Sequence, residues 1–173
     1  MNDIYEIDST NTYRYALGKV NGDRILICIA LNPSTADAEK GDRTYTFCLN
    51  EAKIAGYNGF VMMNLYPLRS TNPNNLPDKC DKVYLDKNLE IFKKLLIDYP
   101  NADIWASWGD RIKSRTYLLD SLKQMCEVSN MHKWLYYGQM TKSKNPRHPS
   151  RVKHNLGFND FSISEYMKGC IIK

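Results

Sequence analysis

The segment Ile25–Leu31, with the sequence ILICIAL, constrains the fold more than any other part of the chain. A strand with one solvent-facing side alternates apolar and polar residues, whereas an uninterrupted apolar run is typical of a strand covered on both faces. Phe60–Leu65 (FVMMNL) and Asp103–Trp108 (DIWASW) have the same character, and Trp134–Gly138 predicts a further strand. The sequence therefore predicts a sheet between two helical layers.

Segments with helical periodicity separate these strands. The expected helices are Arg43–Tyr57, Asp81–Asp98, Arg111–Cys126 and Ser162–Gly169. Alternating strands and helices imply right-handed crossovers, so we expect an α/β fold, a three-layer α/β/α sandwich with a central, mostly parallel four-stranded sheet. Asn21-Gly22 suits a tight turn and adds an expected N-terminal antiparallel hairpin of Tyr13–Val20 with Arg24–Leu31. A length of 173 residues predicts a single domain, residues 1–173.

Composition narrows the function classes. The net charge of +5 and a pI near 8.9 fit an anionic partner such as nucleic acid without requiring one. The five cysteines are dispersed without metal-binding spacing, and no phosphate-binding glycine loop or nucleophile elbow occurs, so we expect no metal and no cofactor. The N-terminus lacks a signal-peptide pattern and no apolar run is long enough to span a bilayer, which predicts a soluble cytoplasmic protein with no membrane and no obligatory protein partner.

Polar residues gather directly after each expected strand. These segments are Asn32–Asp37, Asn64–Thr71, Trp108–Asp110 and Lys142–Arg151. In open α/β sheets the ligand lies beyond the carboxyl ends of the strands. We therefore expect one site, built from these four segments.

Two asparagines are the first candidates in that site. Asn32 precedes the rigid Pro33; it either caps a turn or orients a water molecule, because an amide is too weak a base to deprotonate one. Asn64 lies in an apolar strand, where it either makes a structural hydrogen bond or pairs with the edge of a planar heterocycle. The pattern alone does not choose between these roles.

The segment NPRHPSR at 145–151 carries the third candidate, His148. Prolines on both sides restrict its backbone and so position the imidazole, although loop histidines are often merely exposed. The basic residues Lys142, Arg147 and Arg151 fit phosphate contacts, with a solvated loop as the alternative. Phe47 and Tyr45 could stack on a planar ligand, with core packing as the alternative. Trp105 and Trp108 alternate on a strand, so we expect only one of them to face the site.

The strand-end motifs LNPSTAD, GYNGFVMMNLYPLRSTNP, ASWGD and PRHPS, between residues 25 and 152, resemble the bacterial and phage family DUF1643. The chain has Asp42-Arg43-Thr44 where Asp-Pro-Thr is expected, and His148-Pro149-Ser150-Arg151 where His-Pro-Leu-Tyr is expected. The motifs are also similar, more distantly, to those of the uracil-DNA glycosylase superfamily.

The second resemblance implies roles for individual residues. Asn32 would place the hydrolytic water, with Asp37 as the alternative base; Asn64 would recognise a pyrimidine; His148 would stabilise the departing base. From the resemblance and the strand-end positions together, we expect the substrate-binding residues to be Pro33, Ser34, Phe47, Asn64 and Trp108, and the DNA phosphate-binding residues to be Arg69, Lys142, Arg147, Ser150 and Arg151.

The expected function is that of a DNA glycosylase acting without a cofactor. It would hydrolyse the N-glycosidic bond of a damaged or modified pyrimidine flipped out of DNA, the hypermodified bases of phage DNA included, and leave an abasic site. A role in phage defence fits this activity. Two alternatives stay open: a hydrolase or transferase acting on a free nucleoside or a base modification, and a non-catalytic nucleic-acid-binding module.

Overall fold

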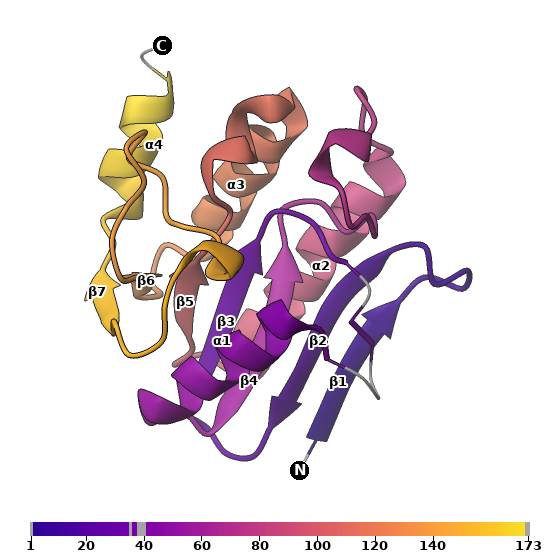
Figure 1. Cartoon of the computed structure of the whole chain (residues 1–173). Coiled ribbons are helices and arrows are strands. Elements are labelled where there is room, and N and C mark those ends of the chain that lie inside the picture. The colour runs from indigo at the N-terminus through magenta and orange to yellow at the C-terminus, as the bar shows by residue number, and fades with distance from the viewer. Residues whose placement is uncertain (1, 35, 38–40, 172–173) are drawn as a thin grey trace.

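A computed structural model describes residues 2–34, 36–37 and 41–171, which form a seven-stranded sheet with helices on both faces (Figure 1). The strands follow the spatial order β1-β2-β4-β3-β5-β6-β7. The strands are β1 (Asn2–Ile7), β2 (Arg14–Val20), β3 (Ile25–Ala30), β4 (Gly59–Asn64), β5 (Asp103–Ala106), β6 (Trp134–Tyr137) and β7 (Phe158–Asp160), and the helices are α1 (Arg43–Ile54), α2 (Lys82–Asp98), α3 (Thr116–Val128) and α4 (Ile163–Ile171). The predicted α/β class is confirmed.

The sheet is larger than the predicted four strands. β3 pairs in parallel with β4 and with β5, and β5 pairs in parallel with β6. Antiparallel pairs β1–β2, β2–β4 and β6–β7 extend this centre at both edges. The edge strands β1 and β7 were missed because β1 mixes charged and apolar residues and β7 spans only Phe158–Asp160.

The predicted hairpin across Asn21-Gly22 is wrong. β2 and β3 are not neighbours, because β4 lies between them. The turn instead contacts Asn58, the residue before β4. The Asn21 N–H donates to the Asn58 carbonyl, and the Asn58 N–H donates to the Arg24 carbonyl. The antiparallel hairpin at the N-terminus is β1–β2 (Figure 1). β4 (GFVMMN) is buried at every position and carries no charged residue, so it gains more by insertion beside β3 than β2 would, since β2 carries Arg14 and Lys19.

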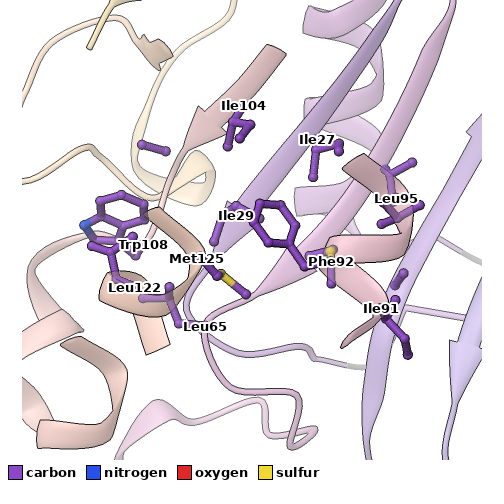
Figure 2. Packing of buried hydrophobic residues seen from close by; sticks show 14 of the residues in the cluster. Ile27, Ile29, Leu65, Ile91, Phe92, Leu95, Ile104, Trp108, Leu122 and Met125 are labelled. Carbon is purple, nitrogen blue, oxygen red and sulfur yellow. The ribbon is translucent and has the colours of Figure 1, made fainter. Parts of the chain in front are cut away.

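Alternate residues of β3 face the two helical layers. Ile27 and Ile29 belong to the cluster that α2 and α3 cover, and Figure 2 shows them beside Phe92 and Leu122. Cys28 belongs to the opposite cluster, which α1 covers. An uninterrupted apolar strand is thus explained by burial on both sides.

Aspartate side chains cap the first two helices. An Asp42 oxygen accepts from the Tyr45 N–H at the start of α1, and an Asp81 oxygen accepts from the Val83 N–H at the start of α2. The helix expected from Arg111 begins at Thr116, after a 3₁₀ turn at Asp110–Ser114. Within the described ranges, no helix has both the length and the apolarity needed to cross a membrane.

Candidate functional site

A cavity of about 790 Å³ opens at the carboxyl ends of β3, β4 and β5, within the size range of clefts that bind small organic ligands. Its walls come from segments that are far apart in the sequence. The lining residues are Arg14, Ala30–Ser34, Asp42, Thr44, Met62, Asn64, Ser70, Thr71, Pro73, Trp108–Arg111, Thr141, Arg147, His148, Ser150 and Arg151. The fold thus brings Asn32, Asn64 and His148 to one cavity.

Asn32 joins two of the loops that form the cavity. Its Nδ2 donates to the Ser70 carbonyl at 2.8 Å and to the Pro33 carbonyl at 3.1 Å, and the Ser70 N–H donates to the Pro33 carbonyl at 2.8 Å. These bonds hold the loop after β3 against the loop after β4. They leave Oδ1 without a hydrogen bond to any described residue, so the acceptor end of the amide is available to a water molecule.

Asn64 is the least satisfied polar group of the cavity. It is 1% exposed, yet neither Oδ1 nor Nδ2 has a hydrogen-bond partner in the described structure. Its backbone carbonyl accepts from Asn88 Nδ2 at 2.8 Å, which fixes the end of β4 against α2. A buried amide without hydrogen-bond partners costs about 1–3 kcal/mol. We therefore expect a ligand to supply the hydrogen bonds that the Asn64 side chain lacks.

His148 is held as a neutral imidazole with a defined tautomer. Its Nδ1 lies 2.8 Å from Ser150 Oγ and accepts from the Ser150 N–H at 3.3 Å. Since a backbone N–H can only donate, Nδ1 carries no proton and the neutral ring carries its proton on Nε2. Burial lowers the pKa of His148 to about 4; the charge of Asp42 opposes this shift and that of Arg151 adds to it. The ring therefore presents an N–H donor at neutral pH.

A chain of hydrogen bonds supports the loop that carries His148. Trp108 Nε1 donates to the Tyr166 hydroxyl at 3.1 Å, and that hydroxyl donates to Asn145 Oδ1 at 2.7 Å. Asn145 Nδ2 and Thr141 Oγ1 both donate to Asp110 Oδ1, at 2.8 and 2.5 Å, and so hold the pKa of Asp110 below its usual range. The loop is thereby tied to α4 and to the end of β5.

Gly109 lets the backbone after β5 approach His148 closely. It has φ +74° and ψ −171°, a conformation that side chains disfavour, and its N–H donates to the Pro146 carbonyl at 2.9 Å. A Cβ at this position would lie 3.3 Å from the Cβ of His148. The glycine therefore determines where the imidazole stands.

Two aromatic residues, Phe47 and Trp108, were expected to bind the substrate. Phe47 does not line the cavity, because one turn along α1 its ring packs against Tyr137 and His154. Trp108 lines the cavity, but its indole packs against Trp134, Phe161 and Tyr166 in the core, as its place in Figure 2 illustrates. The prediction that Phe47 binds the substrate therefore needs correction, whereas Trp108 lines the cavity as predicted.

Three further predicted residues lie outside the cavity. Asp37 and Arg69 line a separate hollow of about 320 Å³. The Arg69 guanidinium donates to the carbonyls of Ser34 and Ala36 at 3.0 and 2.9 Å, and so clamps the loop after β3 instead of facing the site. Lys142 is exposed and is not part of the cavity wall. Pro33, Ser34, Arg147, Ser150 and Arg151 do line it.

The charged residues of the cavity that were not predicted from the sequence include Asp42 and Arg14. Asp42 caps α1 through Tyr45 and also accepts a hydrogen bond from Ser34 Oγ. Arg14 enters from β2, and its Nη1 donates to the Ala36 carbonyl. The available signal for Arg14 was a charged residue at the start of a mainly apolar strand. Asp42 resembled an ordinary helix cap, and only the tertiary structure reveals that it also lines the cavity.

The geometry defines an α/β protein with a polar cavity at the carboxyl ends of its parallel strands. A model of the family described as "Protein of unknown function (DUF1643)" matches residues 14–150, and the chain belongs to this family. No curated protein and no solved structure matches the chain. Among the residues that the structure describes, no group of His, Cys, Asp and Glu side chains is arranged to hold a metal ion.

Proposed function

We propose that this protein is a DNA glycosylase of the uracil-DNA glycosylase type, which removes a modified pyrimidine and leaves an abasic site. The observation that carries the proposal is the convergence of Asn32, Asn64 and His148, from three separate segments, on one cavity in which the Asn64 amide is unpartnered. The three-layer arrangement of helices and sheet is consistent with that fold family.

Asn64 would recognise the base. Its amide offers a donor and an acceptor side by side, which match the adjacent acceptor and donor on the pairing edge of a pyrimidine. Because both atoms are buried and free of other described partners, the bonds gained on binding replace no existing protein bond. This selects for a planar ligand with a complementary edge.

His148 would stabilise the leaving base. When the C1′–N bond breaks, its electron pair stays on the ring nitrogen of the base, and the negative charge is delocalised onto an exocyclic carbonyl oxygen. The neutral imidazole donates its Nε2 hydrogen bond to that oxygen; the low pKa of about 4 disfavours full proton transfer to the histidine at neutral pH. The base anion takes up a proton from solvent on release.

Asn32 and Asp42 would direct the attacking water. Asn32 Oδ1 orients one O–H, while the Asp42 carboxylate takes the proton as the water oxygen bonds to C1′. The same carboxylate stabilises the positive charge of the sugar. Asp42 replaces Asp37 in this role because it lines the cavity with Asn32 and His148, whereas Asp37 lies in the neighbouring hollow.

DNA would lie across the mouth of the cavity. Arg147 and Arg151 line it next to His148, where they can hold the phosphates on either side of a flipped nucleotide. Such contacts make the affinity fall with salt, by about 0.9 logarithmic units per phosphate contact for each tenfold increase in salt. A substrate of this kind fits a cytoplasmic role, including defence against phages whose DNA carries hypermodified pyrimidines.

Duplexes that carry uracil, 5-hydroxymethylcytosine or glucosylated 5-hydroxymethylcytosine test the proposal, with abasic sites detected by alkali cleavage. We expect cleavage of at least one duplex, with the single-turnover rate lowered by about 10²- to 10³-fold in His148→Ala. Phe47→Leu, which changes an aromatic side chain outside the cavity, is the control. Binding without abasic product would support a binding module instead, and activity confined to free nucleosides would support the other class of enzyme.

Asp42→Asn tests the assignment of the base. Asparagine preserves the helix cap, so the variant should fold while its rate falls by about 10²- to 10⁴-fold. Asp37→Asn is the matched control and should retain the wild-type rate. The reverse result would return the role to Asp37.

A further inference from the structure

Arg14 places a deeply buried positive charge in the cavity wall. It is 1% exposed, and its guanidinium forms no ion pair within 4.0 Å among the described residues. Burial, and then the positive charge of Arg69, lower the pKa of Arg14 to about 10, so it stays protonated at neutral pH. The negative charge of Asp42 opposes this shift, but Asp42 forms no ion pair with the guanidinium, and a buried charge without an ion-pair partner is costly. Its retention at a cavity wall points to an anion that arrives with the ligand.

One edge of the Arg14 guanidinium is open. Nη1 donates to the Ala36 carbonyl and so anchors the group. Nε is buried without a hydrogen-bond partner, and Nη2, which shares its edge, donates to no described residue. The Nε–Nη2 edge is the fork with which arginine binds a carboxylate or phosphate through two parallel hydrogen bonds. The side chain is therefore anchored on one edge and available on the other.

The strand order sets where this fork lies relative to a bound base. β3, which leads into Asn32, neighbours β4, which ends at Asn64, and β4 neighbours β2, which begins at Arg14. Neighbouring strands are about 4.8 Å apart. Asn32, Asn64 and Arg14 thus follow one another across the sheet, all on the wall of the same cavity. The Arg14 guanidinium therefore lies on the side of Asn64 that is farther from Asn32.

We propose that Arg14 binds an anionic substituent, a carboxylate or phosphate, carried by the base next to the edge that pairs with Asn64. The orientation of the base rests on the proposed function, whereas the anion subsite itself does not. A cavity of about 790 Å³ has room for a substituted ring. A phosphate of the DNA backbone is the other source of the same chemistry, but a 1% exposed side chain is poorly accessible to a backbone that stays outside.

Binding of small probes tests the subsite without any catalytic step. We expect isothermal titration to show that 5-carboxyuracil binds the wild type about 10- to 100-fold more tightly than uracil, the range for hydrogen bonds to a charged group. Arg14→Gln should abolish that preference and leave uracil binding unchanged. Arg69→Gln, whose guanidinium clamps the same loop from outside the cavity, should keep the preference.

Further arms keep the outcome interpretable. Arg14→Lys retains the charge without the fork and should keep only part of the preference for 5-carboxyuracil over uracil. This variant also tests the subsite if Arg14→Gln fails to fold. Equal binding of the two bases by the wild type overturns the inference. If the wild type binds inorganic phosphate but does not prefer 5-carboxyuracil to uracil, the subsite binds phosphate. That result overturns the proposal that Arg14 binds a substituent of the base. Absence of abasic product in the duplex assay would refute the glycosylase alone, since these titrations require no excision.

Discussion

Asn64→Leu should stabilise the protein while it removes base recognition. Leucine has nearly the shape of asparagine, and the buried Asn64 amide has no partner to lose in the described structure. Removing an unsatisfied buried amide should raise the free energy of unfolding by about 1–3 kcal/mol, less any cost of imperfect packing. For a chain of this size, the melting temperature should rise by roughly 2–4 °C per kcal/mol.

Asn145→Leu is the matched control, with the same substitution at a buried site. Asn145 Nδ2 donates to Asp110 and its Oδ1 accepts from Tyr166, so leucine there removes one hydrogen bond from each partner. Its free energy of unfolding should fall by about 1–3 kcal/mol or more. The two substitutions are thus expected to have opposite signs.

Urea denaturation followed by tryptophan fluorescence measures both variants, and an unchanged m-value shows that the extent of unfolding is the same. Titration with a free pyrimidine measures recognition in parallel. A loss of stability in Asn64→Leu comparable to that of Asn145→Leu would refute the reasoning, because it would mean that the Asn64 amide is already satisfied within the protein. Unchanged pyrimidine binding by the variant would refute its role in recognition.

Three further predictions concern the loop around His148. The pKa of His148 is about 4 in the folded protein and 6.5 in the unfolded chain, so the unfolded chain binds more protons between these two pH values. Lowering the pH from 6.5 to 4 should therefore destabilise the wild type relative to His148→Asn, as measured by urea titrations. Gly109→Ala should lower the free energy of unfolding by about 1–3 kcal/mol because of its backbone conformation, and should reduce activity more than Gly157→Ala, which has positive φ but no close neighbour; a smaller effect at Gly109 would contradict this. Tyr166→Phe should lower activity and increase hydrogen exchange at Asn145, because it removes the shared hydroxyl; unchanged exchange would argue against the support network.

The local sequence pattern was sufficient to predict those strands and helices whose own residues show a clear apolar periodicity. Continuous apolar runs indicated β3 and β4, and helical spacing indicated α1 and α2. The turn at Asn21-Gly22 was misread because its conformation is local, whereas the partner of β2 is chosen by competition among strands for burial. The same limit hid β7, a strand of three residues that exists only because β6 pairs with it.

The sequence alone determined the α/β class and indicated that polar residues after the strands would share an edge, because parallel strands align their carboxyl ends. Tertiary structure decided which residues enter the cavity. Asp42 and Asp37 are equivalent as sequence, but only Asp42 lines the main cavity, since α1 begins there. Arg14 and Arg69 grip the same loop, yet only Arg14 faces the cavity. Side-chain direction depends on the packing of distant segments, and no local pattern contains that information.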